Sequence, residues 1–267
     1  TGIAYGRHGK QHRHKLTSQK NWTISGDNLD LACSIGLITP DVYVSEWDMS
    51  KSPISPPRPD AATTLITNFI GTNFVVEYIN LADPTDKGIV TTANGTFASL
   101  FKLTGLRAGA KYRLIAYPNP NVPGSVFSKL YMTVDAPRLS KVTQWGTTTW
   151  DYLMTAFQQC NYMDITATDI PVFANGIALD HMFLRCSSLV YNPSINNWDM
   201  TKVTSTGNMF GGASSFNQPL RNWDTRNITN MYHMFSNAVS FNQNINCWNT
   251  ENVTSMRAMF AGATSFD

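Results

Sequence analysis

A cluster of histidines and cations near the start of the chain is the first group of residues that could do chemistry. The segment contains His8, His12, His14, Arg7, Lys10, Arg13 and Lys15. Imidazoles bind metals, and a basic docking arm would contact phosphate or an acidic partner. We favour a solvated, flexible terminus, because three histidines packed among cations without a carboxylate make a poor structural metal site.

Acidic side chains that recur at a constant interval form a second group. Asp199 and Asp224 are followed at the same spacing by Asn249, so stacked copies would line one edge. Several oxygens in a row could hold Ca²⁺. We favour a structural role, in which each side chain accepts a backbone N–H in the turn after a tryptophan. The same turn interpretation applies to Asp83 and Asp86.

The four cysteines form no CxxC pair, which argues against a structural zinc site. Cys160 and Cys186 occupy a position at which later copies of a repeated motif carry alanine. A small buried residue is the simplest interpretation, although stacked copies would bring the two Cα atoms close to disulfide range. Cys33 and Cys247 have no evident partner.

No constellation in the chain predicts an enzyme. The sequence contains no nucleophile elbow, P-loop, HExxH motif or dinucleotide fingerprint. A secreted glycan-active enzyme is the one enzymatic alternative, and the absence of a suitable carboxylate pair argues against it. We therefore expect no catalytic residues and no cofactor, with calcium as the weak exception.

An internal repeat of constant period must position the residues of the second half. The triplet Asn197-Trp198-Asp199 recurs at 222–224 and, as Cys-Trp-Asn, at 247–249. Residues 222–241 and 247–266 are identical at ten of twenty positions, which chance does not produce. A unit this short cannot bury its own apolar face, so successive units must stack and share a core. Two degenerate copies precede the three clear ones, which predicts about five rungs with a short strand and a turn each.

Aromatic residues recur at three fixed positions of this repeat. They are Trp198, Trp223, Trp248, Phe210, Phe235, Phe260, Phe216, Phe241 and Phe266. We expect them to form ladders through a core, although the tryptophans could instead form an exposed stripe for carbohydrate or peptide. Asn217 and Asn242 should stack as an amide ladder at a turn. His181 and His233 occupy variable positions, where stacked repeats bind partners.

The motif NWDxxxVTxMxxMFxGAxSFNQPL resembles the 25-residue repeat of BspA-like leucine-rich surface proteins. Such repeats are common in Mycoplasma lipoproteins and Bacteroidetes surface proteins. The resemblance covers about residues 141–267. It implies an extracellular, non-enzymatic β-solenoid used for adhesion or recognition. It transfers no binding residues, because the family's molecular function is mostly unassigned.

The middle of the chain predicts a small β-sandwich. Strand-forming runs lie at 73–80, 96–103, 112–117 and 126–134. The connection from Leu103 to Tyr112 resembles the E–F corner of fibronectin type III domains, in which a tyrosine hydroxyl bonds back to the backbone. This resemblance covers about residues 57–136 and implies an Ig-like sandwich with Tyr112 at its corner. No tryptophan stands in the early strand where the family has one.

These patterns divide the chain into three parts. Residues 1–56 form an N-terminal extension that carries the basic arm, candidate strands at 22–24 and 42–47, and a Pro-rich linker. Residues 57–136 form the sandwich, and residues 137–267 form the stacked repeats. The predicted fold class is therefore mainly β, an Ig-like or fibronectin III-like sandwich followed by a short β-solenoid. We expect further repeats or a partner to cover the C-terminal end, because no polar capping repeat is seen there.

The composition supports β-structure and excludes several classes. Charged residues make up 14%, against roughly 25% in an average domain, and about half of the asparagines lie in residues 192–267, where amides would serve stacked turns. No run approaches 18 apolar residues, so no transmembrane helix is expected. The net charge is +2, but the first 20 residues hold five cations and no acid. The body is therefore slightly acidic, and specific nucleic-acid binding is not expected.

Two non-enzymatic functions fit these features. In the first, an extracellular or cell-surface protein of a bacterium presents the repeats to a protein or glycan on another surface. In the second, the chain is a bacteriophage virion component, such as a tail, fibre or capsid-decorating protein on the virion surface. The basic arm would then dock on neighbouring virion subunits. The sequence names neither the ligand nor the source.

Overall fold

The computed structural model describes residues 41–54, 58–92, 94–95, 101–131, 133–190 and 192–267. These residues are mainly strands and turns with three short 3-10 turns and no α-helix, which confirms a mainly β fold. Residues Asp41–Asp267 form one unit. The basic arm, the candidate strand at 22–24 and Cys33 lie outside the described residues.

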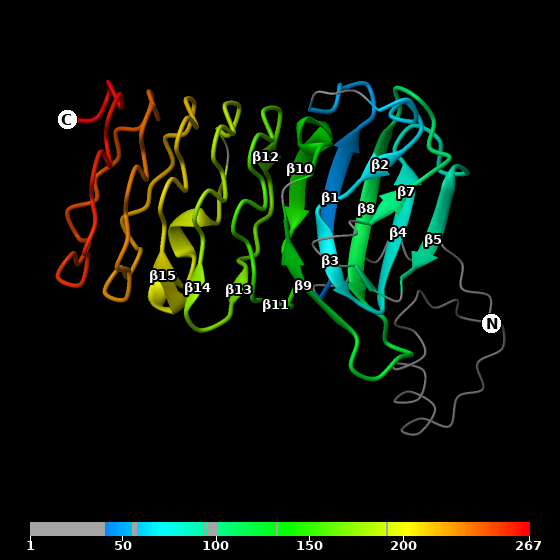
Figure 1. Cartoon of the computed structure of the whole chain (residues 1–267), viewed down its shortest axis with the longest axis horizontal. Helices are drawn as coiled ribbons and strands as arrows, with labels where there is room; N and C mark the ends of the chain where they lie inside the picture. Colours follow the sequence, from blue (N-terminus) through cyan, green and yellow to red (C-terminus); the bar gives the residue numbers. More distant parts are fainter. Residues whose placement is uncertain (1–40, 55–57, 93, 96–100, 132, 191) are drawn as a thin grey trace, which may run out of the picture. The chain divides into compact units, whose positions relative to one another are not determined.

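A six-stranded sheet organises the first half of the described chain (Figure 1). Its strands in spatial order are β12 (Asp164–Ile165), β10 (Leu139–Gln144), β1 (Tyr43–Asp48), β8 (Lys111–Pro118), β4 (Phe74–Asn80) and β5 (Lys87–Thr91). Every residue of β1 is buried, as expected for a strand with neighbours on both sides and a covered face. The sheet is antiparallel until β10 pairs with β12 in parallel.

Smaller sheets pack against the six-stranded one. β3 (Phe69–Thr72), β6 (Asn94–Gly95) and β9 (Val126–Leu130) form one of them, and β2 (Leu65–Ile66) pairs with β7 (Lys102–Leu103). Phe69 joins the layers, because its ring lies edge-on to Trp47 and Tyr43 of β1 at centroid distances of 6.5 and 5.8 Å. Edge-to-face contacts of this kind are favourable for aromatic rings.

The strand pairing differs from the fibronectin-like arrangement that the sequence predicts. In such a sandwich the last strand lies beside the one that carries the corner tyrosine. Here β9 pairs with β3, and β1 takes the place beside β8 over six residue pairs. The strand beside β8 thus comes from the stretch that the sequence assigned to an N-terminal extension.

Strand β10 joins the two regions that the sequence treats as separate. The expected boundary between residues 136 and 137 falls just before this strand, which pairs with β1 on one side and β12 on the other. The sheet therefore continues into the repeat region. Nearly every residue carries a backbone N–H and C=O that can pair with another strand, so the sequence does not reveal which distant strands are partners.

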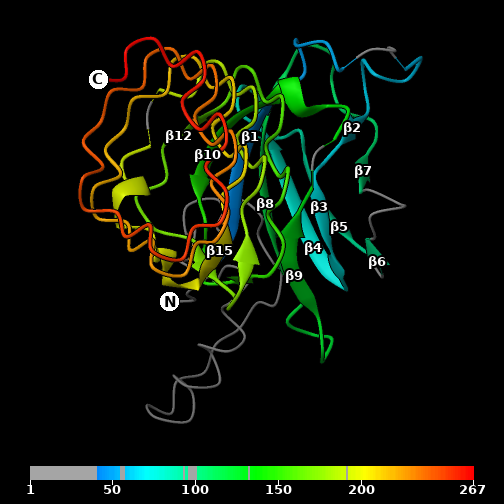
Figure 2. The ribbon, with the colours of Figure 1, turned by 60° about the vertical axis from the view of Figure 1, so that its left-hand side comes forward.

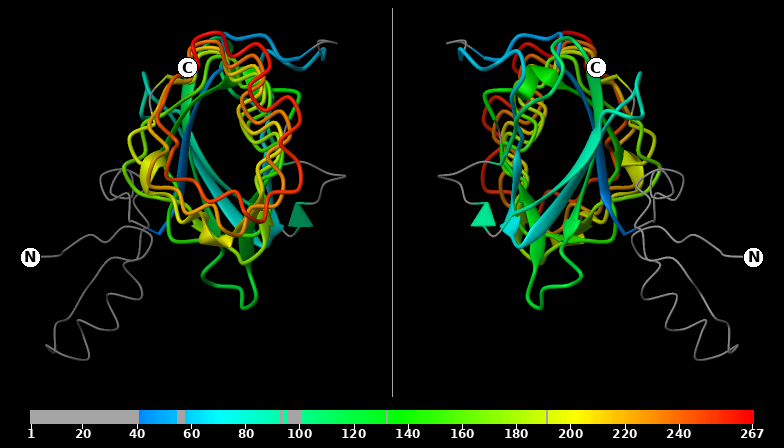
Figure 3. Two further views of the ribbon diagram at one scale, coloured as in Figure 1. Left: turned by 90° about the vertical axis from the view of Figure 1, so that its left-hand side faces the viewer. Right: turned by 90° about the vertical axis from the view of Figure 1, so that its right-hand side faces the viewer.

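Beyond β10 the pairings are parallel and follow the sequence repeat. β11 (Thr149–Trp150) pairs with β13 (Val172–Phe173), and β14 (Ile177–Ala178) pairs with β15 (Val203–Ser205). Isolated bridges from Ser205 to Asn230 and from Asn230 to Ser255 continue the ladder, each step advancing by one repeat. The short strand expected in each rung is reduced to such a bridge in the last two repeats. Figure 3 shows the yellow, orange and red loops overlying one another along the view.

Peptide groups in the turns of successive repeats form hydrogen-bonded columns that run in one direction. The N–H of Phe183 donates to the carbonyl of Met209 at 2.9 Å, and Phe235 donates to Met259 at 2.8 Å. Two flanking N–H groups in each turn, two residues before and two after the phenylalanine, do the same. The turns need left-handed residues, such as His233 with φ of 52°, which non-glycine residues adopt only at some cost.

Stacked aromatic rings fill the interior of the repeats. The first ladder consists of Phe157, Phe183, Phe210, Phe235 and Phe260, with successive centroids 5.5 to 5.6 Å apart. A second ladder of Phe216, Phe241 and Phe266 runs beside it at 6.1 and 5.7 Å. Trp145 connects this core with the sheet, because it contacts both Trp198 and Tyr43. Figure 2 shows the sheet and the stacked loops from an oblique direction.

A buried ion cluster ties β2 to the segment before β10. One carboxylate oxygen of Asp135 accepts the backbone N–H of Ile66 at 2.6 Å and a guanidinium N–H of Arg58 at 2.8 Å. Arg138 lies 3.6 Å from the other oxygen and donates to the carbonyl of Lys51. Asp135 is fully buried and the side chain of Arg138 is 3% exposed. Burial lowers the pKa of Arg138, and the nearby Asp135 opposes that shift.

Candidate functional site

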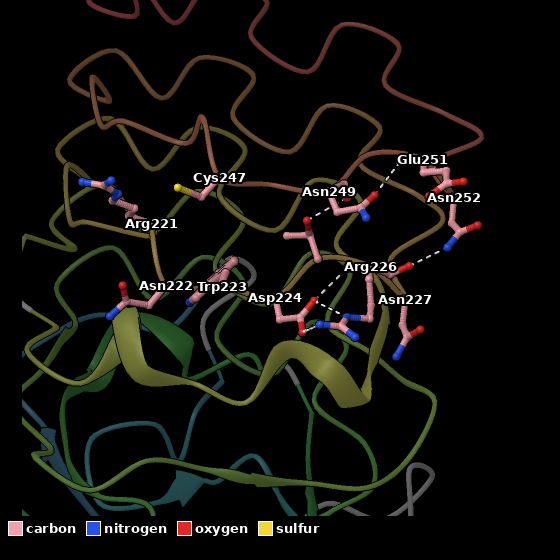
Figure 4. A pocket seen from close by; sticks show the side chains of 11 residues that line it. Arg221, Asn222, Trp223, Asp224, Arg226, Asn227, Cys247, Asn249, Glu251 and Asn252 are labelled. Carbon is pink, nitrogen blue, oxygen red and sulfur yellow. Dashed lines mark hydrogen bonds and ion pairs between the residues drawn. The ribbon is translucent and has the colours of Figure 1, made fainter.

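A polar groove of about 570 Å³ crosses the outer turns of two successive repeats (Figure 4). Its walls come from residues 221–227 of one repeat and from residues 247, 249, 251 and 252 of the next. They carry two arginines, two acidic residues and four asparagines. Polar side chains of mixed character thus gather where equivalent turns lie side by side.

Each wall is shaped by the turn that follows a tryptophan. The side chains of Asp199, Asp224 and Asn249 each accept the backbone N–H of the residue two positions later, at 3.2, 3.2 and 2.9 Å. This is the turn-capping geometry that asparagine and aspartate favour. It places a side-chain oxygen of each copy against its own backbone.

An ion pair occupies the oxygens on which a calcium site would depend. Arg226 donates to both carboxylate oxygens of Asp224, at 2.9 and 2.8 Å. This hydrogen bonding lowers the pKa of Asp224 and raises the pKa of Arg226. Within the described ranges, no three histidine, cysteine or acidic residues are grouped so as to hold a metal ion. In this geometry Asp199 and Asp224 cap their own turns by accepting the backbone N–H of Thr201 and Arg226.

Hydrogen bonds between repeats fix the two walls relative to each other. The amide of Asn252 donates to the carbonyl of Arg226 at 2.7 Å, and the hydroxyl of Thr225 donates to the carbonyl of Asn249 at 2.8 Å. One repeat earlier, the amide of Asn227 donates to the carbonyl of Thr201 at 2.7 Å. The groove is consequently preformed by contacts that recur with the repeat.

At the turn where the sequence predicts an amide ladder, the asparagine side chains bond to the backbone of the neighbouring repeat. They do not bond to each other. The side-chain oxygen of Asn217 accepts the backbone N–H of Asn242 at 2.9 Å, and that of Asn242 accepts the N–H of Asp267 at 3.3 Å. The prediction that the two amide groups pair with each other is therefore wrong, because the partner of Asn217 is the backbone N–H of Asn242. The backbone N–H at this turn needs a hydrogen-bond acceptor, and the asparagine side-chain oxygen of the neighbouring repeat supplies it.

The tryptophans lie beneath the groove and not on its surface. Trp223 is 2% exposed, and its ring stacks between those of Trp198 and Trp248 at centroid distances of 6.5 and 5.9 Å. Its indole N–H donates to the carbonyl of Ile195 at 2.7 Å. Trp198 is equally buried, whereas Trp248 in the last repeat is partly buried. The geometry thus corresponds to tryptophans packed in ladders, and not to an exposed stripe for carbohydrate or peptide.

The other residues singled out from the sequence lie in several places. The six repeat phenylalanines are in the aromatic ladders, and Phe260 and Phe266 are only partly buried. Tyr112 is the second residue of β8, and its hydroxyl reaches back to the preceding corner, where it accepts the N–H of Arg107 at 2.9 Å and donates to Asp86. Burial raises the pKa of Tyr112 to about 12. His8, His12, His14 and the cations of the arm lie outside the described residues.

The cysteines of the repeats are thiols in two different surroundings. Cys160 and Cys186 are free and buried, whereas Cys247 is free and exposed. The thiol of Cys186 donates to the carbonyl of Phe157 at 2.9 Å. Burial raises the pKa of both inner thiols, so the reactive thiolate is scarce there at neutral pH.

In a variant with Cys33 replaced by serine, we expect one thiol to react quickly with a thiol reagent and two thiols to react slowly. Ellman's reagent should modify Cys247 in the folded protein and reach Cys160 and Cys186 only when denaturant is added, because both are shielded and protonated. Mass spectrometry of the modified peptides assigns each thiol. Rapid modification of all three, or a reducible link between the inner two, would contradict the prediction.

Sequence reasoning missed most of the groove residues. It singled out Trp223, Asp224, Cys247 and Asn249, but not Arg221, Arg226, Glu251 or the pair Asn227 and Asn252. The signal that could have found the pair is its own recurrence at the repeat interval, outside the aromatic core. The buried cluster around Asp135 was missed as well, because Arg58 and Ile66 are far from Asp135 in the sequence.

Comparison with known proteins gives one partial match. A family model described as "Mycoplasma protein of unknown function, DUF285" matches residues 177–267, about a third of the chain. This supports the part of the resemblance that concerns BspA-like repeats, and no family match supports a fibronectin or Ig domain. Neither a curated protein nor a solved structure matches the chain. Among the described residues, no helix has the length and apolarity needed to span a membrane.

Proposed function

We propose that the protein is a non-enzymatic, extracellular surface protein that presents a short β-solenoid of stacked repeats to a protein or glycan. In this proposal the β-sheets of the first half of the described chain support the solenoid. The chemistry of the described surface agrees with a binding role, because the groove offers polar side chains held in fixed positions and no metal-ligand cluster.

The distribution of differences between repeats is the observation that carries the proposal. Residues 222–241 and 247–266 share ten positions, and seven of these are buried in the first of the two copies. Of the ten positions that differ, only Ile228 and Ser236 are buried in that copy. The interior is therefore kept constant while the outer face varies, which is the pattern of a scaffold that displays a recognition surface.

A binding screen with surface variants tests this function. The full chain is applied to protein and glycan arrays beside a triple variant, Arg226→Glu, Tyr232→Arg and His233→Ala, which gives one repeat the outer residues of the next. We expect a ligand whose binding is lost or strongly reduced in the variant, with an unchanged unfolding transition. The absence of binding on both kinds of array, or binding that the triple variant leaves unchanged, would contradict the proposal.

A further inference from the structure

The polar groove keeps unused hydrogen-bonding atoms of both kinds. Asn252 and Asn227 each use their amide N–H to bond a backbone carbonyl of the preceding repeat, which leaves the side-chain oxygen as an acceptor. Asn249 does the opposite, because its oxygen accepts the N–H of Glu251 and its amide N–H₂ remains a donor. No other partner for these atoms is found within the described residues.

The charges in the groove balance. The lining holds two guanidinium groups, Arg221 and Arg226, and two carboxylates, Asp224 and Glu251. Arg226 and Asp224 are already paired at 2.8 Å (Figure 4). With equal numbers of each sign the lining has no net charge, so it does not attract an anion or a cation over a distance as a basic or acidic groove would. A ligand without net charge is therefore the one that this lining favours.

The walls expose no large apolar side chain among the lining residues. Trp223 and Thr225 line the groove but are 2% and 1% exposed, so their apolar parts face the interior of the repeats. A peptide that docks through hydrophobic side chains finds no pocket for them, since such interfaces depend on buried apolar anchors. A hydroxyl group suits the walls better, because it donates and accepts at the same time.

We propose that this groove is a binding site for a neutral, hydroxyl-rich glycan. The inference rests on the proposed recognition function and names its ligand class. Hydroxyls of the sugar accept from the amide of Asn249 and donate to the amide oxygens of Asn227 and Asn252. The repeat fixes the separation of the last two acceptors at one rung, because their anchoring bonds lie on successive repeats.

A single substitution separates the donor role of Asn249 from its structural role. Asn249→Asp keeps the oxygen that accepts the N–H of Glu251, as aspartate already does at position 224. It replaces the amide donor with a carboxylate oxygen and adds a negative charge to the groove. The reverse change, Asp199→Asn, alters the equivalent turn of a repeat whose residues do not line the groove, and it serves as the matched control.

Binding of the full chain to neutral, sialylated and sulfated oligosaccharides tests the inference, with the protein array in parallel. We expect neutral glycans to bind preferentially, Asn249→Asp to weaken that binding at least tenfold, and Asp199→Asn to leave it unchanged. Thermal unfolding of both variants should match that of the parent chain. Preference for acidic glycans, or neutral-glycan binding that Asn249→Asp does not weaken, would overturn the inference. Protein binding without glycan binding would also overturn it while leaving the recognition function in place.

Discussion

Replacing Phe235 with alanine should lower the free energy of unfolding by about 3–5 kcal/mol, the cost of a large cavity in a packed core. The ring is fully buried and stacks between Phe210 at 5.5 Å and Phe260 at 5.6 Å. It also lies 3.9 Å from Phe241 of the second ladder. The cavity cannot collapse easily, because the backbone columns hold neighbouring turns at a fixed spacing.

Urea unfolding followed by tryptophan fluorescence measures this effect, and Phe260→Ala is the matched control. Phe260 carries the same side chain at the same repeat position, but it is only partly buried and its ladder has one described neighbour. We expect the control to lose clearly less stability. Equal losses at the two positions would mean that stacking between repeats contributes little to the core.

Replacing Asp135 with asparagine should destabilise the protein by about 3–5 kcal/mol, the usual cost of breaking a buried ion pair from one side. The substitution keeps the shape of the side chain but leaves the guanidinium of Arg138, which is 3% exposed, without its counter-charge. Arg58 loses the same partner. A buried unpaired charge is costly because water cannot reach it.

Two further variants make this prediction specific. Asp60→Asn removes another carboxylate that pairs with Arg58 at 3.1 Å, but Asp60 is 54% exposed, so the expected change is about 0–1 kcal/mol. Adding Arg138→Met to Asp135→Asn removes the orphaned charge and should recover part of the loss. If the double variant is as unstable as the sum of its single changes, the ion pair is not the cause.

The sequence by itself determined the period and the interior of the second half. Residues that recur at the repeat interval meet their copies when repeats stack, so identity at Trp223, Phe235 and Phe241 already specifies ladders. The same logic placed Asp224 and Asn249 in equivalent turns. Local spacing carries this information because each contact joins residues whose separation is constant.

Only the tertiary structure decided how the first half is paired and how the two halves join. β1 lies between β8 and β10, and the Asp135 cluster joins residues from distant segments. Backbone hydrogen bonds are available to every residue, so a strand's partner depends on the geometry of the whole sheet.

The groove belongs to both kinds of information. Repetition brings Asn227 and Asn252 onto one face, and this could be read from their spacing. Which of their atoms remain free depends on bonds to the carbonyls of Thr201 and Arg226, and the predicted amide ladder at Asn217 failed for the same reason. An amide can donate or accept, so the folded backbone around it determines which of the two it does.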